Sequence, residues 1–252
     1  MSVFLTGDTH GVFSRLSNKN WKQSKDLTKE DYVIILGDCG LIFNPVMTND
    51  ELYWKKWLDG KPWTTLYICG NHDNHPKLND LPRDLKFGAE VGSISDSIFH
   101  LRRGEIYTIE GRTFLAFGGA TSIDRESRTT GVSWWPEEVP SYTEMDHCLD
   151  SINDHNHKVD VILAHTCPQS IAPIIAGYRG LHLHDDPTQK MLNHITTVCE
   201  FDHFFCGHFH LNMDYKNYHF LYERIANLDE VIERYNSEDT GTDFTFQYQD
   251  TD

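Results

Sequence analysis

The chain has 252 residues, of which 38 are acidic and 22 are basic, so its formal net charge at pH 7 is -16. A chain of this length can form one sizeable domain, and single α/β domains of this size are common. The negative charge disfavours duplex nucleic acid as a partner, because binding to such a polyanion requires a basic surface.

The six cysteines include no Cys-x-x-Cys pair and no disulfide-type spacing. We interpret them as small buried residues of a reducing compartment; the alternative is that those beside polar motifs act as thiolate ligands or redox sensors. The sequence does not begin with a basic segment and a short apolar region, and no apolar run is long enough to cross a membrane. These features predict a cytoplasmic protein without membrane contact.

Five apolar segments rich in β-branched and aromatic residues are predicted to form buried strands. In chain order they cover residues 3–6, 32–36, 64–69, 161–164 and 204–206. They alternate with helix-like patterns, which is typical of α/β proteins, in which helices cover the faces of a sheet.

Two of the predicted helices begin with a capping box, Thr48 with Glu51 and Ser141 with Glu144. Further helices are expected directly after Gly11, from Asp186-Pro187 onward and at residues 228–235. In the helix after Thr48, four residues are expected to pack in the core: Leu52, Trp54, Trp57 and Leu58.

The other segments are irregular or form hairpins. Residues 74–92 contain Pro76, Pro82 and Gly88 and are expected to form a loop over the site. Short turns separate strand-like segments at 97–101, 105–109 and 113–117, and residues 213–222 resemble another hairpin. We expect one domain over residues 1–235, followed by an acidic tail, 236–252, that forms an edge strand or is disordered.

Each of the five main strands is followed by Asp, Asn or His. Because the carboxyl ends of parallel strands meet at one edge of a sheet, we expect these side chains to lie together. Carboxylate and amide oxygens mixed with imidazole nitrogens suit borderline divalent ions. The alternative for any single histidine is a hydrogen-bonded structural role. The residues concerned are Asp8, His10, Asp38, Asn71, His72, Asp73, His165, His208 and His210.

The order of the motifs is Asp-x-His, Gly-Asp, Gly-Asn-His-Asp, a lone His after a strand, and Gly-His-x-His. This order resembles that of the calcineurin-like metallophosphoesterase superfamily over residues 3–210. Residues 118–128 and 134–138 look like a segment found in a subset of its small bacterial and phage members. The resemblance implies a four-layer α-β-β-α sandwich with two mixed sheets packed face to face. It also implies two divalent metal ions, with manganese expected and iron, zinc, nickel, cobalt or magnesium as alternatives.

The resemblance further implies a role for each site residue. Asp38 bridges the two ions; Asp8, His10 and His210 complete the shell of one ion, and Asn71, His165 and His208 that of the other. A hydroxide held between the ions is the expected nucleophile. His72 is the expected general acid, and Asp73 beside it is expected to hold its imidazolium form and raise its pKa.

Residues 118–128 leave a strand through two glycines, and Arg125 or Arg128 could bind phosphate oxygens there, together with Asn71. The alternative is a surface loop in which both arginines pair with Asp124 or Glu126. Some relatives carry a charged residue after Gly-Asp where this chain has Cys39-Gly40, so their phosphate contacts are not carried over.

Three functions are compatible with these residues. The leading one is a metal-dependent phosphoesterase that acts on a small phosphomonoester or phosphodiester. The second is a nuclease of the same chemistry, against which the net charge argues unless Arg102, Arg103, Arg125 and Arg128 form a basic groove. The third is a catalytically silent binding protein on the same fold, which the presence of every expected ligand disfavours. The sequence gives no oligomeric state.

Overall fold

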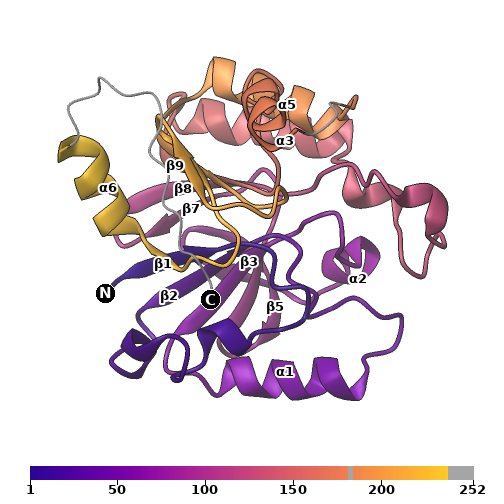
Figure 1. Cartoon of the computed structure of the whole chain (residues 1–252), viewed down its shortest axis with the longest axis vertical. Coiled ribbons are helices and arrows are strands. Elements are labelled where there is room, and N and C mark those ends of the chain that lie inside the picture. The colour runs from indigo at the N-terminus through magenta and orange to yellow at the C-terminus, as the bar shows by residue number, and fades with distance from the viewer. Residues whose placement is uncertain (181–183, 238–252) are drawn as a thin grey trace.

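The structure, a computed structural model, describes residues 1–180 and 184–237. Two mixed sheets pack face to face, and helices lie on the outer side of each sheet (Figure 1). This confirms the predicted four-layer α-β-β-α sandwich. The first sheet has the order β13 (Ala226–Asn227), β1 (Val3–Thr6), β2 (Tyr32–Leu36), β3 (Thr64–Ile68), β6 (Ile98–Leu101), β5 (Ala89–Ser95) and β4 (Arg83–Lys86). The second has the order β11 (Met213–Tyr215), β12 (Tyr218–Phe220), β10 (Glu200–Cys206), β9 (Lys158–Ala164), β8 (Arg112–Phe117) and β7 (Ile106–Ile109).

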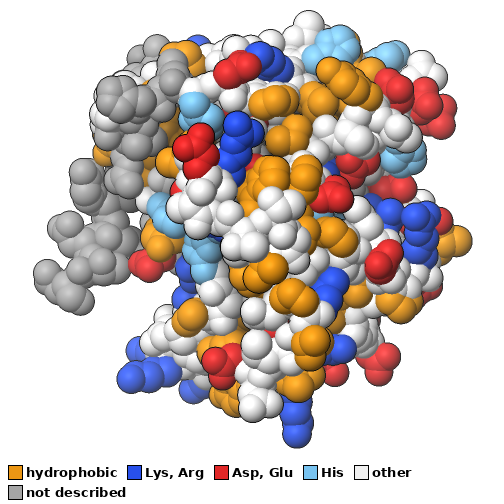
Figure 2. Space-filling model, turned by 90° about the vertical axis from the view of Figure 1, so that its right-hand side faces the viewer, with side chains coloured by type: hydrophobic (Ala, Val, Ile, Leu, Met, Phe, Trp, Pro, Cys, Tyr) orange, Lys and Arg blue, Asp and Glu red, His pale blue; other side chains and the backbone are white. Residues whose placement is uncertain are grey.

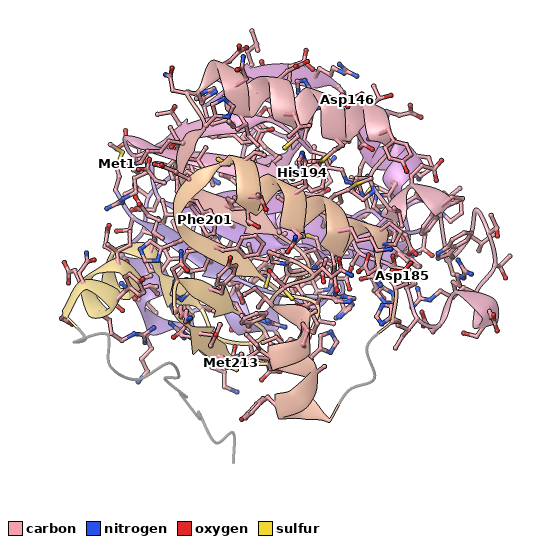
Figure 3. The ribbon with its side chains drawn as sticks, turned by 90° about the horizontal axis from the view of Figure 1, so that it is seen from above. Met1, Asp146, Asp185, His194, Phe201 and Met213 are labelled. Carbon is pink, nitrogen blue, oxygen red and sulfur yellow. The ribbon has the colours of Figure 1, made fainter. Side chains whose placement is uncertain are left out.

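Helices connect the strands and cover the sheets. Seen from above, α3 with Asp146 and α5 with His194 lie over the second sheet (Figure 3). The α-helices are α1 (Asn49–Asp59), α2 (His75–Asn79), α3 (Tyr142–Asp154), α4 (Ala172–Arg179), α5 (Pro187–Val198) and α6 (Leu228–Ser237). The 3-10 helices are η1 (Ser14–Leu16), η2 (Lys22–Lys25), η3 (Arg125–Ser127) and η4 (Pro136–Glu138).

The core lies in three layers, because neighbouring residues of a strand point to opposite faces of the sheet. Ile34 of β2 belongs to the layer between the sheets, together with Val161 of β9. Its neighbour Val33 packs outward in the cluster that contains Leu58 of α1. Burial on both faces explains why these strands appear in the sequence as continuous apolar runs.

Parallel pairing brings the polar motifs to one edge of the sandwich. Strands β1, β2 and β3 are parallel neighbours, and so are β9 and β10. Residues 7–10, 37–38 and 70–73 follow the first three strands, and residues 165 and 207–210 follow the other two. The carboxyl ends of both sheets therefore supply the site, as is usual for α/β folds.

The predicted helix starts are confirmed where a capping side chain is present. Thr48 and Glu51 form a capping box at α1, and Ser141 and Glu144 form one at α3. Asp186 caps α5 by accepting a hydrogen bond from the backbone of Thr188. Of the four α1 residues expected in the core, Leu58 is buried and both tryptophans are half-buried, but Leu52 is exposed.

Two other expectations about helices and loops are wrong. The segment after Gly11 forms turns and the three-residue η1, because Gly11 itself has a φ of 74° and Phe13 inserts into the core. Residues 74–92 form α2, β4 and part of β5 instead of a loop over the site. Pro76 lies in the first turn of α2, where proline is tolerated, and Gly88 forms the turn between β4 and β5.

The predicted hairpins are confirmed only in part. Strands β7 and β8 pair in antiparallel fashion, and so do β11 and β12. Strands β6 and β7 belong to different sheets, so residues 97–109 cross between the sheets instead of forming a hairpin. Helix α6 ends at Ser237, so the first two residues of the expected tail, 236–252, are helical. The rest of that tail, 238–252, lies outside the described residues. None of the helices in the described ranges has the length and apolar character needed to span a bilayer.

Candidate metal centre

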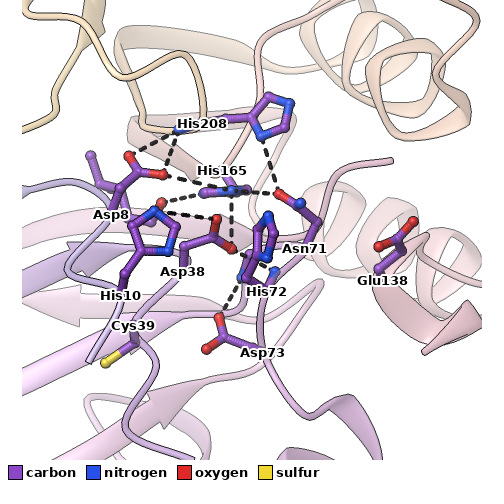
Figure 4. Close-up of polar contacts among 12 residues, drawn as sticks. Asp8, His10, Asp38, Cys39, Asn71, His72, Asp73, Glu138, His165 and His208 are labelled. Atoms are coloured by element: carbon purple, nitrogen blue, oxygen red, sulfur yellow. Dashed lines mark hydrogen bonds and ion pairs between the residues drawn. The ribbon is translucent and has the colours of Figure 1, made fainter. Parts of the chain in front are cut away.

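Five polar residues at the strand ends have a left-handed backbone conformation. The φ angle is 38° at Asp8, 45° at His10, 48° at Asp38, 66° at His208 and 48° at His210. Residues other than glycine rarely adopt such angles, which cost about 1–3 kcal/mol each and collect at functional sites. The fold thus keeps unfavourable backbone angles at residues whose side chains belong to one site, and Figure 4 shows four of them, Asp8, His10, Asp38 and His208, close together.

Asp8, His10 and His210 form a first group of donors. Nε2 of His10 lies 3.1 Å from Nε2 of His210, which in turn lies 3.6 Å from Oδ1 of Asp8. One donor atom from each residue lies within 4.8 Å of the other two, a spacing that could hold a metal ion. Asp8 is buried and both histidines are exposed, so this group is open to solvent on one side.

Asn71, His165 and His208 form a second group. Oδ1 of Asn71 lies 3.1 Å from Nε2 of His165 and 3.1 Å from Nδ1 of His208. Asn71 and His165 are buried and His208 is half-buried, so this group lies deeper than the first.

Two carboxylates lie between the groups. Oδ1 of Asp38 is 3.4 Å from Nε2 of His165, and its Oδ2 is 4.0 Å from Nε2 of His10. Asp8 also approaches both sides, with Oδ1 at 4.0 Å from Nε2 of His165. The oxygens of Asp38 therefore face different groups, which is the arrangement that a bridging ligand requires.

The donors fit a cation better than they fit one another. Nδ1 of His165 lies 2.7 Å from the carbonyl oxygen of Leu36, so this nitrogen donates and Nε2 of the neutral ring carries a lone pair. That lone pair faces oxygens of Asp38 and Asn71, which are acceptors as well. A positive charge between them removes the conflict, and a histidine whose other nitrogen donates to a carbonyl is a usual metal ligand.

The pKa shifts of the site residues also indicate that the site favours a positive charge between its carboxylates. Although burial opposes it, the carboxylates of Asp38 and Asp8 raise the pKa of His165 to about 10. The pKa of Asp38 is lowered in spite of burial, because of His165. Burial and the charge of His165 lower the pKa of His208 to about 3, and burial lowers the pKa of His10. Ionised Asp38 and neutral His208 and His10 are in the forms that metal ligands take, whereas His165 keeps a proton that a bound cation would displace.

Two glycines leave room for the carboxylates. A Cβ atom on Gly70 would lie 2.1 Å from Oδ1 of Asp38, and a Cβ atom on Gly207 would lie 2.5 Å from Oδ2 of Asp8. The Gly-Asn-His-Asp and Gly-His-x-His motifs therefore need glycine for close approach to an acid from another strand.

His72 lies beside the two groups, but its relation to Asp73 differs from the prediction. The carboxylate of Asp73 accepts hydrogen bonds from the backbone N–H groups of Gly40 at 3.1 Å and Gly70 at 2.8 Å. It thus braces the turn that carries His72 instead of holding the imidazolium. Burial lowers the pKa of His72, where the sequence suggested a raised value. Burial and the charge of Asp38 raise the pKa of Asp73 to about 6.

The two candidate arginines lie in different surroundings. Nη2 of Arg128 is 3.1 Å from Nε2 of His72, and the same guanidinium donates to both carboxylate oxygens of Asp124 at 2.8 and 2.7 Å. Arg125 lies in η3 with its side chain exposed. The structure thus contains an ion pair with Asp124 and also brings Arg128 to the site, while phosphate binding by either arginine stays a prediction.

A buried chain of hydrogen bonds behind Asn71 was not anticipated. Nδ2 of Asn71 donates to Oγ of Ser122 at 3.0 Å, and Oγ of Ser122 donates to Oε2 of Glu138 at 2.5 Å. Glu138, only 1% exposed, also accepts from the backbone of Ser122 at 2.9 Å. These bonds hold the amide of Asn71 so that its oxygen faces His165 and His208. The only sequence signal was the presence of Ser122 and Glu138 in an unusual Gly-Gly and Trp-Trp-Pro segment.

Arg15 and Tyr222 also support the site without having been predicted. Nη1 of Arg15 donates to the carbonyl oxygens of Gly7, at 2.8 Å, and Tyr222, and its Nη2 donates to that of Asp8 at 3.0 Å. The ring of Tyr222 stacks on His210 with 4.5 Å between centroids. Both contacts fix the turn of the first group, and the bond from Arg15 to Tyr222 joins residues 207 positions apart in the chain.

A comparison with known proteins identifies the family of the chain. The family model of calcineurin-like phosphoesterases matches residues 1–212, and the chain belongs to this family. Membership supports a metal-dependent phosphoester hydrolase in general, and the Asp and His groups described above are possible ligands for the divalent ions that this family binds. A comparison with curated proteins gives no significant match.

Proposed function

We propose that the protein is a dinuclear metal-dependent phosphoesterase that hydrolyses a small phosphomonoester or phosphodiester. The observation that supports this most strongly is the gathering of oxygen and nitrogen donors from five strand ends into two adjacent groups, with two acids between them. Asp8, His10 and His210 would hold one ion, Asn71, His165 and His208 the other, and Asp38 would bridge them. We expect manganese at both positions.

The proposed reaction divides the chemistry between the metals and the chain. When bound, the ions would polarise the phosphoryl group and lower the pKa of a water molecule that attacks phosphorus. His72 would donate its Nε2 proton to the leaving oxygen as the P–O bond breaks. Arg128 would move from this nitrogen to the oxygens of the substrate phosphate, where a guanidinium can bind in bidentate fashion.

A small phosphorylated substrate suits the surface better than an extended nucleic acid. The formal charge is -16, and on the described part of the face in Figure 2 basic side chains are interspersed with acidic and apolar ones. Binding of a polyanion uses a basic stripe or patch, which this face does not present. All six cysteines are buried free thiols, which supports a reducing, cytoplasmic environment as part of the proposal.

The test is hydrolysis by protein that has been stripped with a chelator and reloaded with manganese, nickel or cobalt. Substrates would be p-nitrophenyl phosphate, its bis ester and a panel of nucleotides. We expect hydrolysis only with metal, and two metal ions per chain by elemental analysis. Two bound ions without hydrolysis of any substrate would contradict the proposed activity and favour a silent binding protein.

A matched pair of variants separates the proposed bridge from a general effect of charge. Asp38→Asn should reduce the metal content below two and abolish hydrolysis. Asp84→Asn makes the same change of charge on the exposed strand β4 and should leave both unchanged. Full metal content in Asp38→Asn would refute the bridging role.

A further inference from the structure

A second cavity, here called the arginine cavity, lies beside α2 and α3 at the end of β6. Its volume is about 400 Å³, and its walls include His75, His100, Arg102, Arg103 and Glu144. Among the residues that the structure describes, none lines both this cavity and the cavity at the metal centre.

The walls of the arginine cavity contain buried nitrogens without hydrogen bonds. Of the seven buried side-chain nitrogen or oxygen atoms without a partner in the described residues, four belong to His75, His100 and Arg102. They are Nε2 of His75, both ring nitrogens of His100 and Nη1 of Arg102. Buried polar groups are nearly always paired, so a concentration of unpaired ones indicates a ligand that the structure does not contain.

His100 is the clearest case. It lies in β6, and only 3% of its surface is exposed. Burial and the charges of Arg102 and Arg103 lower its pKa to about 3, so the ring is neutral and offers one N–H group. That N–H group has no acceptor among residues 1–180 and 184–237.

His75 adds a second donor of the same kind. Its Nδ1 lies 3.4 Å from Nη2 of Arg103, and a guanidinium can only donate, so Nδ1 accepts and Nε2 carries the hydrogen. Nε2 has no hydrogen-bond partner among the described residues. The backbone of Gly70 raises the pKa of the ring, but by less than burial and Arg103 lower it.

The acidic residues of the cavity are already paired. Glu144 binds Arg103 at 3.2 Å, and Glu90 binds Arg83 at 2.9 Å. Glu105 lies 3.0 Å from Nε2 of His147. Among the ion pairs of the described residues, none includes Arg102. The positive charge of Arg102 thus lies beside a set of unpaired donors without a carboxylate to balance it.

We propose that the arginine cavity binds a small oxyanion, a phosphate or a carboxylate, between Arg102, His100 and His75. An oxyanion supplies several acceptor oxygens and a negative charge, which are the two properties that the walls lack. A cation would be repelled by the unbalanced charge of Arg102, and an apolar ligand would leave the nitrogens unpaired.

The position of the cavity gives such a ligand an influence on the metal centre. Cys69 and His75 line the cavity and flank the turn that carries Asn71 and His72. Arg103 also donates to the backbone carbonyl oxygens of Gly118 at 2.9 Å and Glu138 at 3.0 Å. A bound anion should therefore stabilise the turn from behind. This inference goes beyond the proposed function and does not depend on it.

The test locates and measures an anion in the full chain. Crystals soaked in selenate should show an anomalous peak beside Arg102 and His100, and calorimetry should show saturable binding of phosphate or succinate in the millimolar range or tighter. Stronger binding of phosphate would identify phosphate as the ligand class, and stronger binding of succinate would identify a carboxylate.

Three variants test whether the anion binds at Arg102 and His100. Arg102→Gln should remove the peak and weaken binding at least tenfold, and His100→Phe, which keeps a ring in the core, should weaken it as well. Arg112→Gln makes the same change of charge in the other sheet, where Arg112 pairs with Asp229, and should change neither. A peak at the metal centre alone, binding that does not saturate, or equal binding by all three variants would overturn the proposal.

Discussion

Nη2 of Arg128 lies 3.1 Å from Nε2 of His72, and the guanidinium is held there by two hydrogen bonds to Asp124. Because a guanidinium has no acceptor, Nε2 of His72 must carry a lone pair in this arrangement. The ring can therefore act as an acid at Nε2 only after Arg128 has moved and Nε2 has taken up a proton from solvent. Substrate phosphate is the natural competitor for Arg128, so binding of phosphate and release of His72 would occur together.

This coupling predicts a large effect of Arg128 on substrate affinity. Arg128→Gln should raise the KM for p-nitrophenyl phosphate by about 10- to 100-fold, the range expected for loss of a hydrogen bond to a charged group. Arg125→Gln is the matched control, because Arg125 lies on the same segment with its side chain exposed. Steady-state kinetics of both variants provide the measurement. Equal KM values for the two variants would show that Arg128 does not bind the phosphate.

The chain of bonds from Glu138 through Ser122 to Asn71 predicts an effect on metal affinity. Without it the amide of Asn71 can rotate and present its NH2 group to the ion. We expect Ser122→Ala and Glu138→Gln to weaken binding of the second manganese ion by about 10- to 100-fold, as is typical for partners of metal ligands. Titration of stripped protein followed by calorimetry measures this directly.

Glu137→Gln provides the control for this prediction. Glu137 neighbours Glu138 in η4 but is exposed, so its replacement should leave both binding constants unchanged. If Ser122→Ala bound two ions as tightly as the wild-type chain, Asn71 would be oriented by some other contact. Circular dichroism of each variant shows whether the fold is intact.

A third prediction follows from the close contact between Gly70 and Asp38. In Gly70→Ala the new Cβ atom would meet Oδ1 of Asp38 at 2.1 Å and its backbone nitrogen at 2.3 Å, so Asp38 must move. Metal content should fall below two ions per chain. Gly177→Ala is the control. Gly177 lies in α4, a Cβ atom there meets no described atom within 4 Å, and the substitution should stabilise the helix by about 0.5–1 kcal/mol. Unchanged metal content in Gly70→Ala would mean that Asp38 is not fixed by this contact.

The sequence predicted the parts of the fold that depend on local patterns. Continuous apolar runs revealed the buried strands, and the spacing of Thr48 and Glu51 revealed the start of α1. Both features depend only on residues close together in the sequence. The prediction of a loop for residues 74–92 was wrong because proline and glycine occur both in loops and at particular positions of helices and hairpins. In a loop they break structure, whereas Pro76 and Gly88 occupy the tolerated positions of a helix start and a hairpin turn.

The supporting contacts of the site could not be predicted, because they join residues far apart in the chain. Nothing near Asn71 in the sequence indicates that Ser122 will fix its amide. The partner of Asp73 was misjudged because adjacency to His72 suggested a contact, but its carboxylate is turned to the backbone of Gly40 and Gly70. The left-handed backbone conformations of the aspartates and histidines could not be predicted either, because these residue types rarely adopt positive φ angles.

A fourth prediction concerns acid stability and a buried network remote from the metal centre. Asp214 of β11 accepts hydrogen bonds from Nδ1 of His219 at 2.8 Å and Nη1 of Arg224 at 3.0 Å, and it also binds Arg234 of α6. Burial alone would raise its pKa, but these partners lower the pKa to about 2. The network ties α6 to the second sheet, so its ionised form stabilises the folded state.

Because the pKa of Asp214 is lower in the folded chain than in the unfolded one, the stabilisation is complete above about pH 4 and disappears as the pH falls through about 2. The shift from 3.8 to about 2 corresponds to roughly 2 kcal/mol. Urea unfolding should therefore show that Asp214→Asn costs clearly more free energy at pH 5 than near pH 2. Asp84→Asn, at an exposed acid, should cost little at either pH. A cost for Asp214→Asn that does not change with pH would mean that the network stabilises the fold by packing and not through the charge of Asp214.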